Sequence, residues 1–385
     1  MDAVTLLAHR VRAALAAAVP AARQQWVLGG SSRAMNPSAS SASSATSTPS
    51  TSSSALLTLL LSSLTPTLPA VNWTLSQPGV SIAPSPLPPP GASSQGDEII
   101  RQFTALGRST EWALVEKVAF EGDTFETEGL VRLGNDRYFV SAGEWTVPRS
   151  TSTVTADGTT VAGQGFAHML VFDGKGTRIA DATITTAGAA EYHGGGIEYD
   201  GTYIWSTLAQ YRPDSTATLV RMRPDTLQPE PILRIADHMG AVVHDLSTGD
   251  LLTLNWGARS ASLWNLNYKP NPLPDFTAPR AVIKNPSHYT DYQDCKFLGH
   301  SQQYGFRPVM ICGGITSLYG TTIGGVALVD MQTMVPLYEV PLTMLSDRGV
   351  LVTKNPMDVA IVDGKMRLFF LPDERNSTLY AYEAA

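Results

Sequence analysis

Residues 191–210 have the sequence EYHGGGIEYDGTYIWSTLAQ. Apolar and aromatic residues stand on both sides of Asp200-Gly201, and this dipeptide favours a tight hairpin because both residues tolerate positive φ. Three glycines at 194–196 come just before the first predicted strand, where they allow two backbones to approach closely. The segment therefore predicts two short antiparallel strands behind a glycine-rich entry.

The same layout returns in residues 237–256, DHMGAVVHDLSTGDLLTLNW. His238 falls 45 residues after His193, and Asp245 falls 45 residues after Asp200. Looser copies occupy residues 126–138, 291–299 and 356–369. A repeat of about 40–50 residues with several strands in each unit is typical of a β-propeller.

The repeats divide residues 111–385 into five units, which predicts an all-β domain formed by a single β-propeller of five blades. Long connections between the units leave room for one more, so a six-bladed ring is the alternative. Residues 112–120 alternate as a strand ahead of the first unit, and we expect them to complete the last blade and close the ring. The five units are residues 124–183, 193–235, 238–283, 291–340 and 356–383.

Residues 1–97 differ from this domain in composition. They are rich in Ser, Thr, Ala and Pro and carry no charged side chain between Arg33 and Asp97. Such a segment buries too little apolar surface to offset the entropy of ordering, so we expect it to be disordered. Residues 1–26 resemble a transit peptide, whereas residues 55–64 resemble the apolar part of a secretory signal and are too few to span a bilayer. A short helix is expected at residues 98–107.

Other features indicate the secretory pathway. Asn72 and Asn376 each open an Asn-x-Ser/Thr triplet that fits N-glycosylation. Cys295 and Cys312 lie in neighbouring predicted strands, where we expect a cross-strand disulfide, with two buried thiols as the alternative. The net charge of −7 and the lack of a basic stripe argue against a nucleic-acid partner. We therefore expect a secreted protein without an integral membrane span.

The start of each repeat is the candidate functional position, because the innermost strands of a propeller end around one channel. Glu126, His193, His238 and Asp291 occupy equivalent starting positions. Imidazole and carboxylate groups serve as acids, bases or metal ligands near neutral pH. The alternative is that each side chain caps its own turn. No His-x-His or His-Glu-x-x-His spacing is present, so we expect no metal cofactor, with a divalent cation as the alternative.

Aromatic residues near the same strand ends provide a candidate wall for a flat or terpenoid-like ligand. Arg212, beside Tyr211, is either a group that binds an enolic or anionic oxygen or a solvated loop residue. The candidate catalytic residues are His193, His238, Tyr211, Arg212 and Asp291. The candidate substrate-binding residues are Glu126, Trp205, Trp256, Tyr289, Tyr292 and Met357.

Six sequence blocks occur in order between residues 193 and 383: HGGGIEYDGTYIW, AQYRPDSTATLVRMRPDTL, ADHMGAVVHD, NPSHYTDYQDCKFLG, TKNPMDV and STLYAYE. They resemble a fungal and bacterial family of secreted-type propellers of largely unassigned role, which includes the fungal hetero-Diels–Alderases of tropolonic sesquiterpenoid biosynthesis. The chain departs from that pattern at Glu126-Thr127-Glu128-Gly129, at Glu198 and at Gln210.

The resemblance implies an enzyme of secondary metabolism that directs a [4+2] cycloaddition between a quinone-methide or tropolone-type diene and a terpenoid alkene. Such a site has to exclude water, hold two apolar partners together and hydrogen-bond one oxygen. His193 or His238 would assist dehydration to the diene. Two alternatives are a metal-dependent lactonase-type hydrolase, using Glu126, His193, His238 and Asp291, and a secreted binding module without catalysis.

Overall fold

The computed structural model describes residues 72–75, 79–107, 109–148, 150–154, 160–161, 163–266 and 276–385. The targeting segments expected at residues 1–26 and 55–64 lie outside these ranges. In the described part of the chain, no helix is long and apolar enough to cross a membrane.

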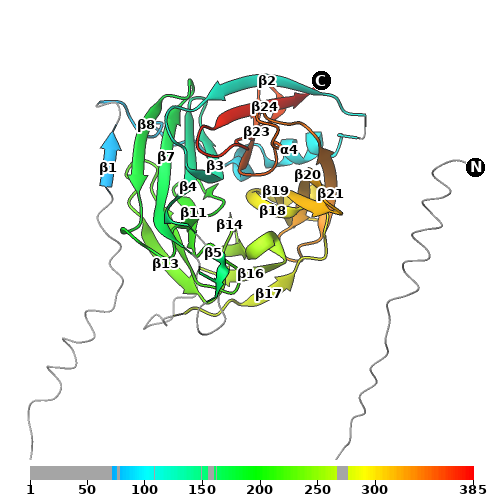
Figure 1. Ribbon diagram of the computed structural model, residues 1–385. Coiled ribbons are helices and arrows are strands. Elements are labelled where there is room, and N and C mark those ends of the chain that lie inside the picture. Colours follow the sequence, from blue (N-terminus) through cyan, green and yellow to red (C-terminus); the bar gives the residue numbers. More distant parts are fainter. Residues whose placement is uncertain are drawn as a thin grey trace, which may run out of the picture. The chain divides into compact units, whose positions relative to one another are not determined.

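Five antiparallel sheets form a five-bladed β-propeller, as the repeats predict (Figure 1). Blade 1 contains β3 (Glu126–Leu133), β4 (Arg137–Val147), β7 (Gln164–Asp173) and β8 (Arg178–Thr183), with β1 (Asn72–Leu75) at its outer edge. Blade 2 contains β10 (Glu198–Tyr199), β11 (Ile204–Ala209), β12 (Ala217–Met222) and β13 (Glu230–Ile235), and β9 (His193–Gly194) also pairs with β11. Blade 3 contains β14 (Ala241–Asp245), β15 (Asp250–Leu254), β16 (Ser260–Asn265) and β17 (Ala281–Lys284).

The last two blades complete the ring. Blade 4 contains β18 (Asp291–Ser301), β19 (Arg307–Leu318), β20 (Thr321–Asp330) and β21 (Pro336–Leu342). Blade 5 contains β22 (Met357–Val362), β23 (Lys365–Phe370), β24 (Thr378–Ala384) and β2 (Trp112–Ala119). β2 pairs with β24 from Trp112↔Ala384 to Ala119↔Thr378, so the early strand closes the last sheet as expected. A separate pair, β5 (Ser150–Val154) and β6 (Thr160–Val161), follows β4.

The hydrophobic core lies between the blades. Side chains alternate along each strand, so Leu130 and Val140 face blade 5 while Val131 and Phe139 face blade 2. Five apolar clusters of this kind occupy the five junctions between neighbouring blades. Each sheet is therefore buried on both faces, and the hydrophobic effect holds the ring together.

The Asp200-Gly201 hairpin forms as the sequence predicts. Tyr199 of β10 pairs with Ile204 of β11, and Gly201 adopts a positive φ of 95° that glycine tolerates. The Asp200 carboxylate accepts the backbone N–H groups of Thr202 and Tyr203 and so fixes the turn.

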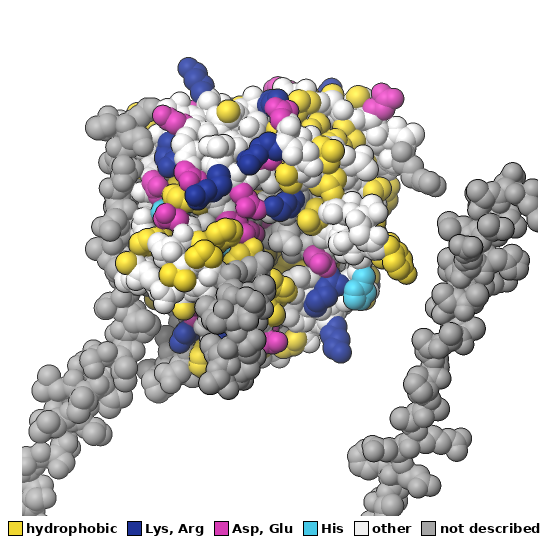
Figure 2. Space-filling model, in the orientation of Figure 1, with side chains coloured by type: hydrophobic (Ala, Val, Ile, Leu, Met, Phe, Trp, Pro, Cys, Tyr) yellow, Lys and Arg dark blue, Asp and Glu magenta, His cyan; other side chains and the backbone are white. Residues whose placement is uncertain are grey.

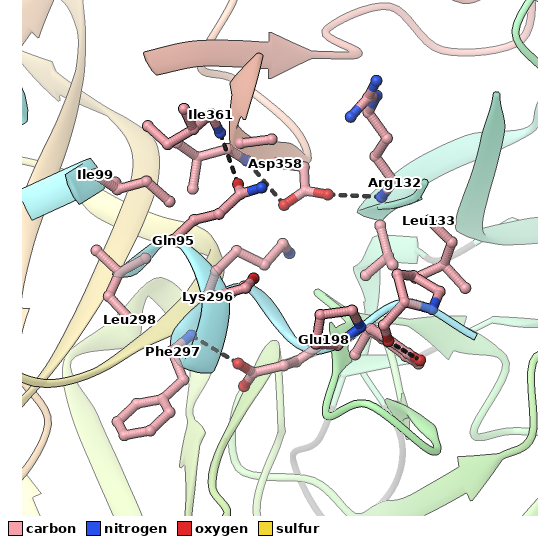
Figure 3. Close-up of a pocket in the computed structure, with 18 of the residues that line it drawn as sticks. Gln95, Ile99, Arg132, Leu133, Glu198, Lys296, Phe297, Leu298, Asp358 and Ile361 are labelled. Atoms are coloured by element: carbon pink, nitrogen blue, oxygen red, sulfur yellow. Dashed lines mark hydrogen bonds between the residues drawn. The ribbon is translucent and has the colours of Figure 1, made fainter. Parts of the chain in front are cut away.

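Carboxylates on the inner strands accept hydrogen bonds from other blades. Glu198 of blade 2 accepts the N–H of His244 in blade 3 and the N–H of Phe297 in blade 4, both at 2.7 Å. Asp358 of blade 5 accepts the N–H of Arg132 in blade 1 at 2.6 Å. The bonds to Phe297 and Arg132 are visible in Figure 3. Buried backbone N–H groups require such partners, and these carboxylates supply them across the ring.

Asp294 of β18 has the same role near the middle of the channel. Its carboxylate accepts the N–H of Leu130 in blade 1 at 3.1 Å and that of Met357 in blade 5 at 3.3 Å. Lys296 compensates the buried charge, since its Nζ lies 2.6 Å from Asp294 Oδ1. These contacts connect three blades through one side chain.

Two short helices cover one end of the channel. They are α3 (Gly91–Ser94) and α4 (Gly96–Phe103), and α4 buries Ile99, Ile100 and Phe103 against blades 4 and 5. Gln95 Oε1 accepts the N–H of Ile361 at 2.7 Å (Figure 3). This order in residues 79–97 differs from the disorder expected there, because contacts with the distant ring supply the stabilisation that the local composition lacks.

Cys295 and Cys312 form a disulfide between the facing strands β18 and β19, as expected. Asn376 is exposed in the loop between β23 and β24 and is accessible for glycosylation. The side chain of Asn72 lies outside what the structure describes. Secretion itself stays a prediction.

Candidate functional site

A cavity of about 310 Å³ opens at one end of the channel, where the inner strands β3 and β18 begin. We call it the upper cavity. Its polar and aromatic lining includes Glu126, Glu128, His193, Tyr211, His238, Trp256, Asp291, Tyr292, Lys354 and Glu374. A second cavity of about 240 Å³, the lower cavity, lies at the opposite end beneath α3 and α4 and is lined by Glu198, Lys296 and Asp358 among others (Figure 3).

Glycines narrow the channel between the two cavities. A Cβ atom added to Gly129 would lie 2.7 Å from Ile197 N, and one added to Gly195 would lie 2.4 Å from Gly240 O. Both separations are shorter than real Cβ contacts, so only glycine fits at these positions. The glycine run that opens blade 2 therefore serves close approach of backbones, as the sequence predicts.

The predicted convergence of equivalent strand ends is present. His193 and His238 belong to neighbouring repeats, and their ring centroids lie 5.8 Å apart. The predicted residues that line the upper cavity are Glu126, His193, Tyr211, His238, Trp256, Asp291 and Tyr292. The register of the repeats therefore located the cavity.

Two other predicted site residues, Arg212 and Trp205, point away from the upper cavity. Arg212 does not line the upper cavity, since its guanidinium donates to Gln210 Oε1 at 3.1 Å and to the carbonyl of Asp214 at 3.2 Å. Trp205 lies in the apolar junction of blades 2 and 3, where its Nε1–H donates to Asp200 Oδ2 at 2.6 Å. Arg212 stabilises its own loop, and Trp205 stabilises the core.

Tyr289 and Met357 are also structural by position. The Tyr289 ring packs so closely on Gly325 that an added Cβ would meet its hydroxyl at 2.6 Å. Met357 is fully buried between blades 4 and 5, with its sulfur against Gly313. Neither residue reaches the upper cavity: Tyr289, in the loop before β18, packs on blade 4, and Met357, the first residue of β22, turns its side chain toward blade 4.

Glu126, His193 and Tyr211 form one group in the upper cavity. Tyr211 Oη donates to Glu126 Oε1 at 2.6 Å, and the Tyr211 ring stacks on His193 at a centroid distance of 4.3 Å and an angle of 19°. His193 Nδ1 lies 3.8 Å from Glu126 Oε2. Stacking fixes the orientation of the imidazole, and the carboxylate contacts both ring systems.

His238 lines the same cavity, and its ring is a neighbour of the His193 ring. Its Nδ1 lies 3.0 Å from the carbonyl oxygen of Gln210, so Nδ1 carries the hydrogen and Nε2 keeps its lone pair. Burial lowers the pKa of His238 to about 4, against the weaker effect of this hydrogen bond. The imidazole is therefore neutral at pH 7. Trp256 contacts it edge to face at 4.9 Å.

Asp291 lies at the rim of the cavity. It pairs with Arg259 at 2.7 Å, and both side chains are partly exposed. Desolvation raises the pKa of Asp291, with Arg259 acting in the opposite direction. The pair is therefore a charged edge of the opening. Figure 2 shows acidic and basic side chains gathered near the middle of the face that it presents.

Among the lining residues that sequence reasoning missed, three are charged: Glu128, Lys354 and Glu374. Lys354 Nζ lies 2.7 Å from Glu374 Oε1. Glu128 is buried, and desolvation together with the neighbouring Glu126 raises its pKa well above the usual range. Glu128 follows Glu126 by two residues, but the register of β3 against β4 shifts at Glu128, so simple alternation along the strand does not reveal it.

Residues 87–385 match a family described as a family of unknown function, DUF6454. The chain belongs to this family. No curated protein matches its sequence. The propeller of this DUF6454 member is similar to two solved structures, each at 9% identity over 71% of this chain. A luciferin-regenerating enzyme is covered over 95% of its length with a TM-score of 0.38, and a GH43 β-xylosidase/α-arabinofuranosidase from a compost microbial metagenome over 94% with a TM-score of 0.39. Similarity at this level transfers no activity.

Proposed function

We propose that this propeller is an enzyme that binds a flat, partly apolar small molecule in the upper cavity and transfers a proton at one of its oxygens. The observation that supports this proposal is the meeting of an aromatic wall and polar groups in one cavity. Tyr211 and Trp256 supply apolar ring faces, and their centroids lie 5.6 Å apart. His238 and Glu126 supply hydrogen-bonding atoms beside those faces.

The resemblance of the sequence blocks narrows the proposed reaction to hetero-Diels–Alder chemistry. A tropolone-type alcohol would lose one water: its C–O bond breaks, the departing hydroxyl group takes up a proton, and the ring hydroxyl supplies that proton through His238. The resulting quinone-methide diene would add to a terpenoid alkene, forming two bonds with no further proton transfer. His238 Nε2 accepts the hydroxyl proton or its hydrogen bond, while Tyr211 and Trp256 hold the ring.

Binding is tested first, with tropolone as the probe. Because Trp256 lines the cavity, tropolone should quench tryptophan fluorescence in the wild-type protein and quench it less in Trp256→Phe. Trp264→Phe is the matched control, since Trp264 is buried in the junction of blades 2 and 3.

Turnover is tested with a hydroxylated tropolone-type precursor and a terpenoid alkene, and products are measured by chromatography and mass spectrometry. The wild-type protein should raise the rate and fix one stereoisomer, and His238→Gln should lower the rate roughly 10²–10⁴-fold, as for loss of a general base. His300→Gln is the control, because His300 lies away from this cavity and bonds to Asp245. A rate and isomer ratio equal to those without protein would leave a non-catalytic binding propeller.

A further inference from the structure

Glu126, Glu128 and His193 form a cluster at the upper end of the inner strands. One donor atom of each residue lies within 4.8 Å of the donor atoms of the other two. The glutamates come from β3 of blade 1 and the histidine from β9 of blade 2. Their exposed fractions are 7%, 8% and 4%, so the surrounding blades hold all three side chains in place.

We propose that this cluster binds a divalent transition-metal ion of the manganese or zinc type. Glu128 gives the strongest support. Its carboxylate lines the upper cavity and is more than nine-tenths buried, and no hydrogen-bond donor reaches it from the described residues. A buried carboxylate in this state is unfavourable unless a cation or a proton compensates it.

The charges around the cluster favour an added cation. Lys354 is the nearby ammonium group, and it already lies 2.7 Å from Glu374 Oε1. One ammonium group therefore stands beside three carboxylates, those of Glu126, Glu128 and Glu374, in the same cavity. A divalent ion between Glu126 and Glu128 would turn their mutual repulsion into attraction.

The donor set and its spacing identify the class of ion. His193 Nδ1 and Glu126 Oε2 lie 3.8 Å apart, which suits two ligands of one ion at bond lengths of about 2.1 Å. Calcium and magnesium prefer oxygen ligands, whereas an imidazole beside carboxylates suits zinc or manganese. Three protein ligands leave coordination positions that face the cavity, as in catalytic sites.

The sequence hides this site because its ligands come from two blades. His193 follows Glu128 by 65 residues, so no local metal-binding motif exists. The expected set of Glu126, His193, His238 and Asp291 differs from the observed cluster, since Asp291 pairs with Arg259 and His238 bonds to a backbone carbonyl.

The experiment uses the purified full chain after removal of metal with a chelator. Calorimetric titration with manganese chloride and with zinc chloride should show one site in the wild-type protein. Glu128→Gln should weaken binding by more than about 10²-fold, and Glu128→Asp should weaken it less, because only the latter keeps an anionic ligand. Asp291→Asn is the matched control, since it removes a carboxylate from the rim of the same cavity that pairs with Arg259 outside the cluster, and its affinity should stay within about threefold of wild type.

Thermal unfolding provides a second readout that does not depend on activity. Without metal, Glu128→Gln should have a higher Tm than the wild type, because it removes a buried carboxyl group whose ionisation is opposed by desolvation and by Glu126. With saturating metal the wild type should gain stability and the order of the two Tm values should reverse. Absence of binding, equal binding by wild type and Glu128→Gln, or an unchanged order of Tm would overturn the proposal. Metal titration and thermal unfolding do not measure turnover, so the metal-binding proposal and the proposed enzymatic function can each fail without the other.

Discussion

His238 places its two ring nitrogens in different surroundings. Nδ1 donates to the Gln210 carbonyl, and burial lowers the pKa of the ring to about 4, whereas an unfolded histidine titrates near 6.5. The unfolded chain therefore binds a proton more readily than the native protein does. The same neutral imidazole that suits proton acceptance in the cavity makes the native state sensitive to acid.

We predict that His238→Gln reduces the loss of stability in acid. A folded pKa below the unfolded value means that the stabilising contribution of His238 is complete above about pH 6.5 and is lost as pH falls through 4. Between pH 7 and pH 4 the wild type should lose about 3 kcal/mol more of its free energy of unfolding than the variant. Urea unfolding at both pH values measures this difference, and parallel losses would contradict the prediction.

The short inner strand β10 depends on Glu198 for its connections to other blades. Glu198 accepts N–H groups from His244 and Phe297, and burial raises its pKa to about 8 despite these two bonds. β10 has only two residues, so it forms few backbone hydrogen bonds with β11. The two bonds that Glu198 accepts add contacts to β14 and β18, the inner strands of blades 3 and 4. One carboxylate thus links three sheets.

Substitution of Glu198 should show a graded effect. Glu198→Ala leaves two buried N–H groups without acceptors, and we expect it to lower the free energy of unfolding by about 3–5 kcal/mol. Glu198→Gln keeps one acceptor oxygen and should lower it by about 1–2 kcal/mol. Glu230→Gln, at an exposed ion pair with Arg221 in the same blade, should change it by less than about 1 kcal/mol. Equal unfolding curves for all three variants would exclude this role of Glu198.

The sequence predicted the strands and turns better than it predicted which way individual side chains face. The Asp200-Gly201 turn and the alternating strands are set by local backbone preferences, and the register of the repeats brought His193 and His238 together. Whether Trp205 faces the channel or the next blade depends on strand twist and packing, which a single sequence does not encode locally. Glu128 lies where the register of β3 against β4 shifts, and such a bulge obscures alternation. Residues 79–97 gain order from Ile361 and other distant partners.

The whole ring is held closed by β2. Phe120 N–H donates to Ser377 O at 2.9 Å, and alternate residues of an antiparallel strand point their N–H groups the same way. Val118 therefore also directs its N–H toward β24. Val115 lies at the register shift between Leu114 and Glu116 and is exposed.

We predict that Val118→Pro lowers the free energy of unfolding by about 3 kcal/mol, because proline removes this N–H and disturbs the closing pair. Val115→Pro is the matched control and should lower it by less than about 1 kcal/mol, since proline is tolerated at bulges of edge strands. Thermal and urea unfolding of the two variants measure the difference. Similar losses for both would mean that closure by β2 does not limit the stability of the ring.

The closing strand pair also fixes the position of Ala385. β24 begins at Thr378, a few residues after Glu374 at the upper cavity, and its seven residues carry the backbone about 20 Å toward the opposite end. Ala385 follows directly and donates its N–H to Glu111 O at 2.9 Å. A linker or immobilising support attached after Ala385 would thus lie at the end of the ring opposite the upper cavity, and the opening of that cavity would stay accessible.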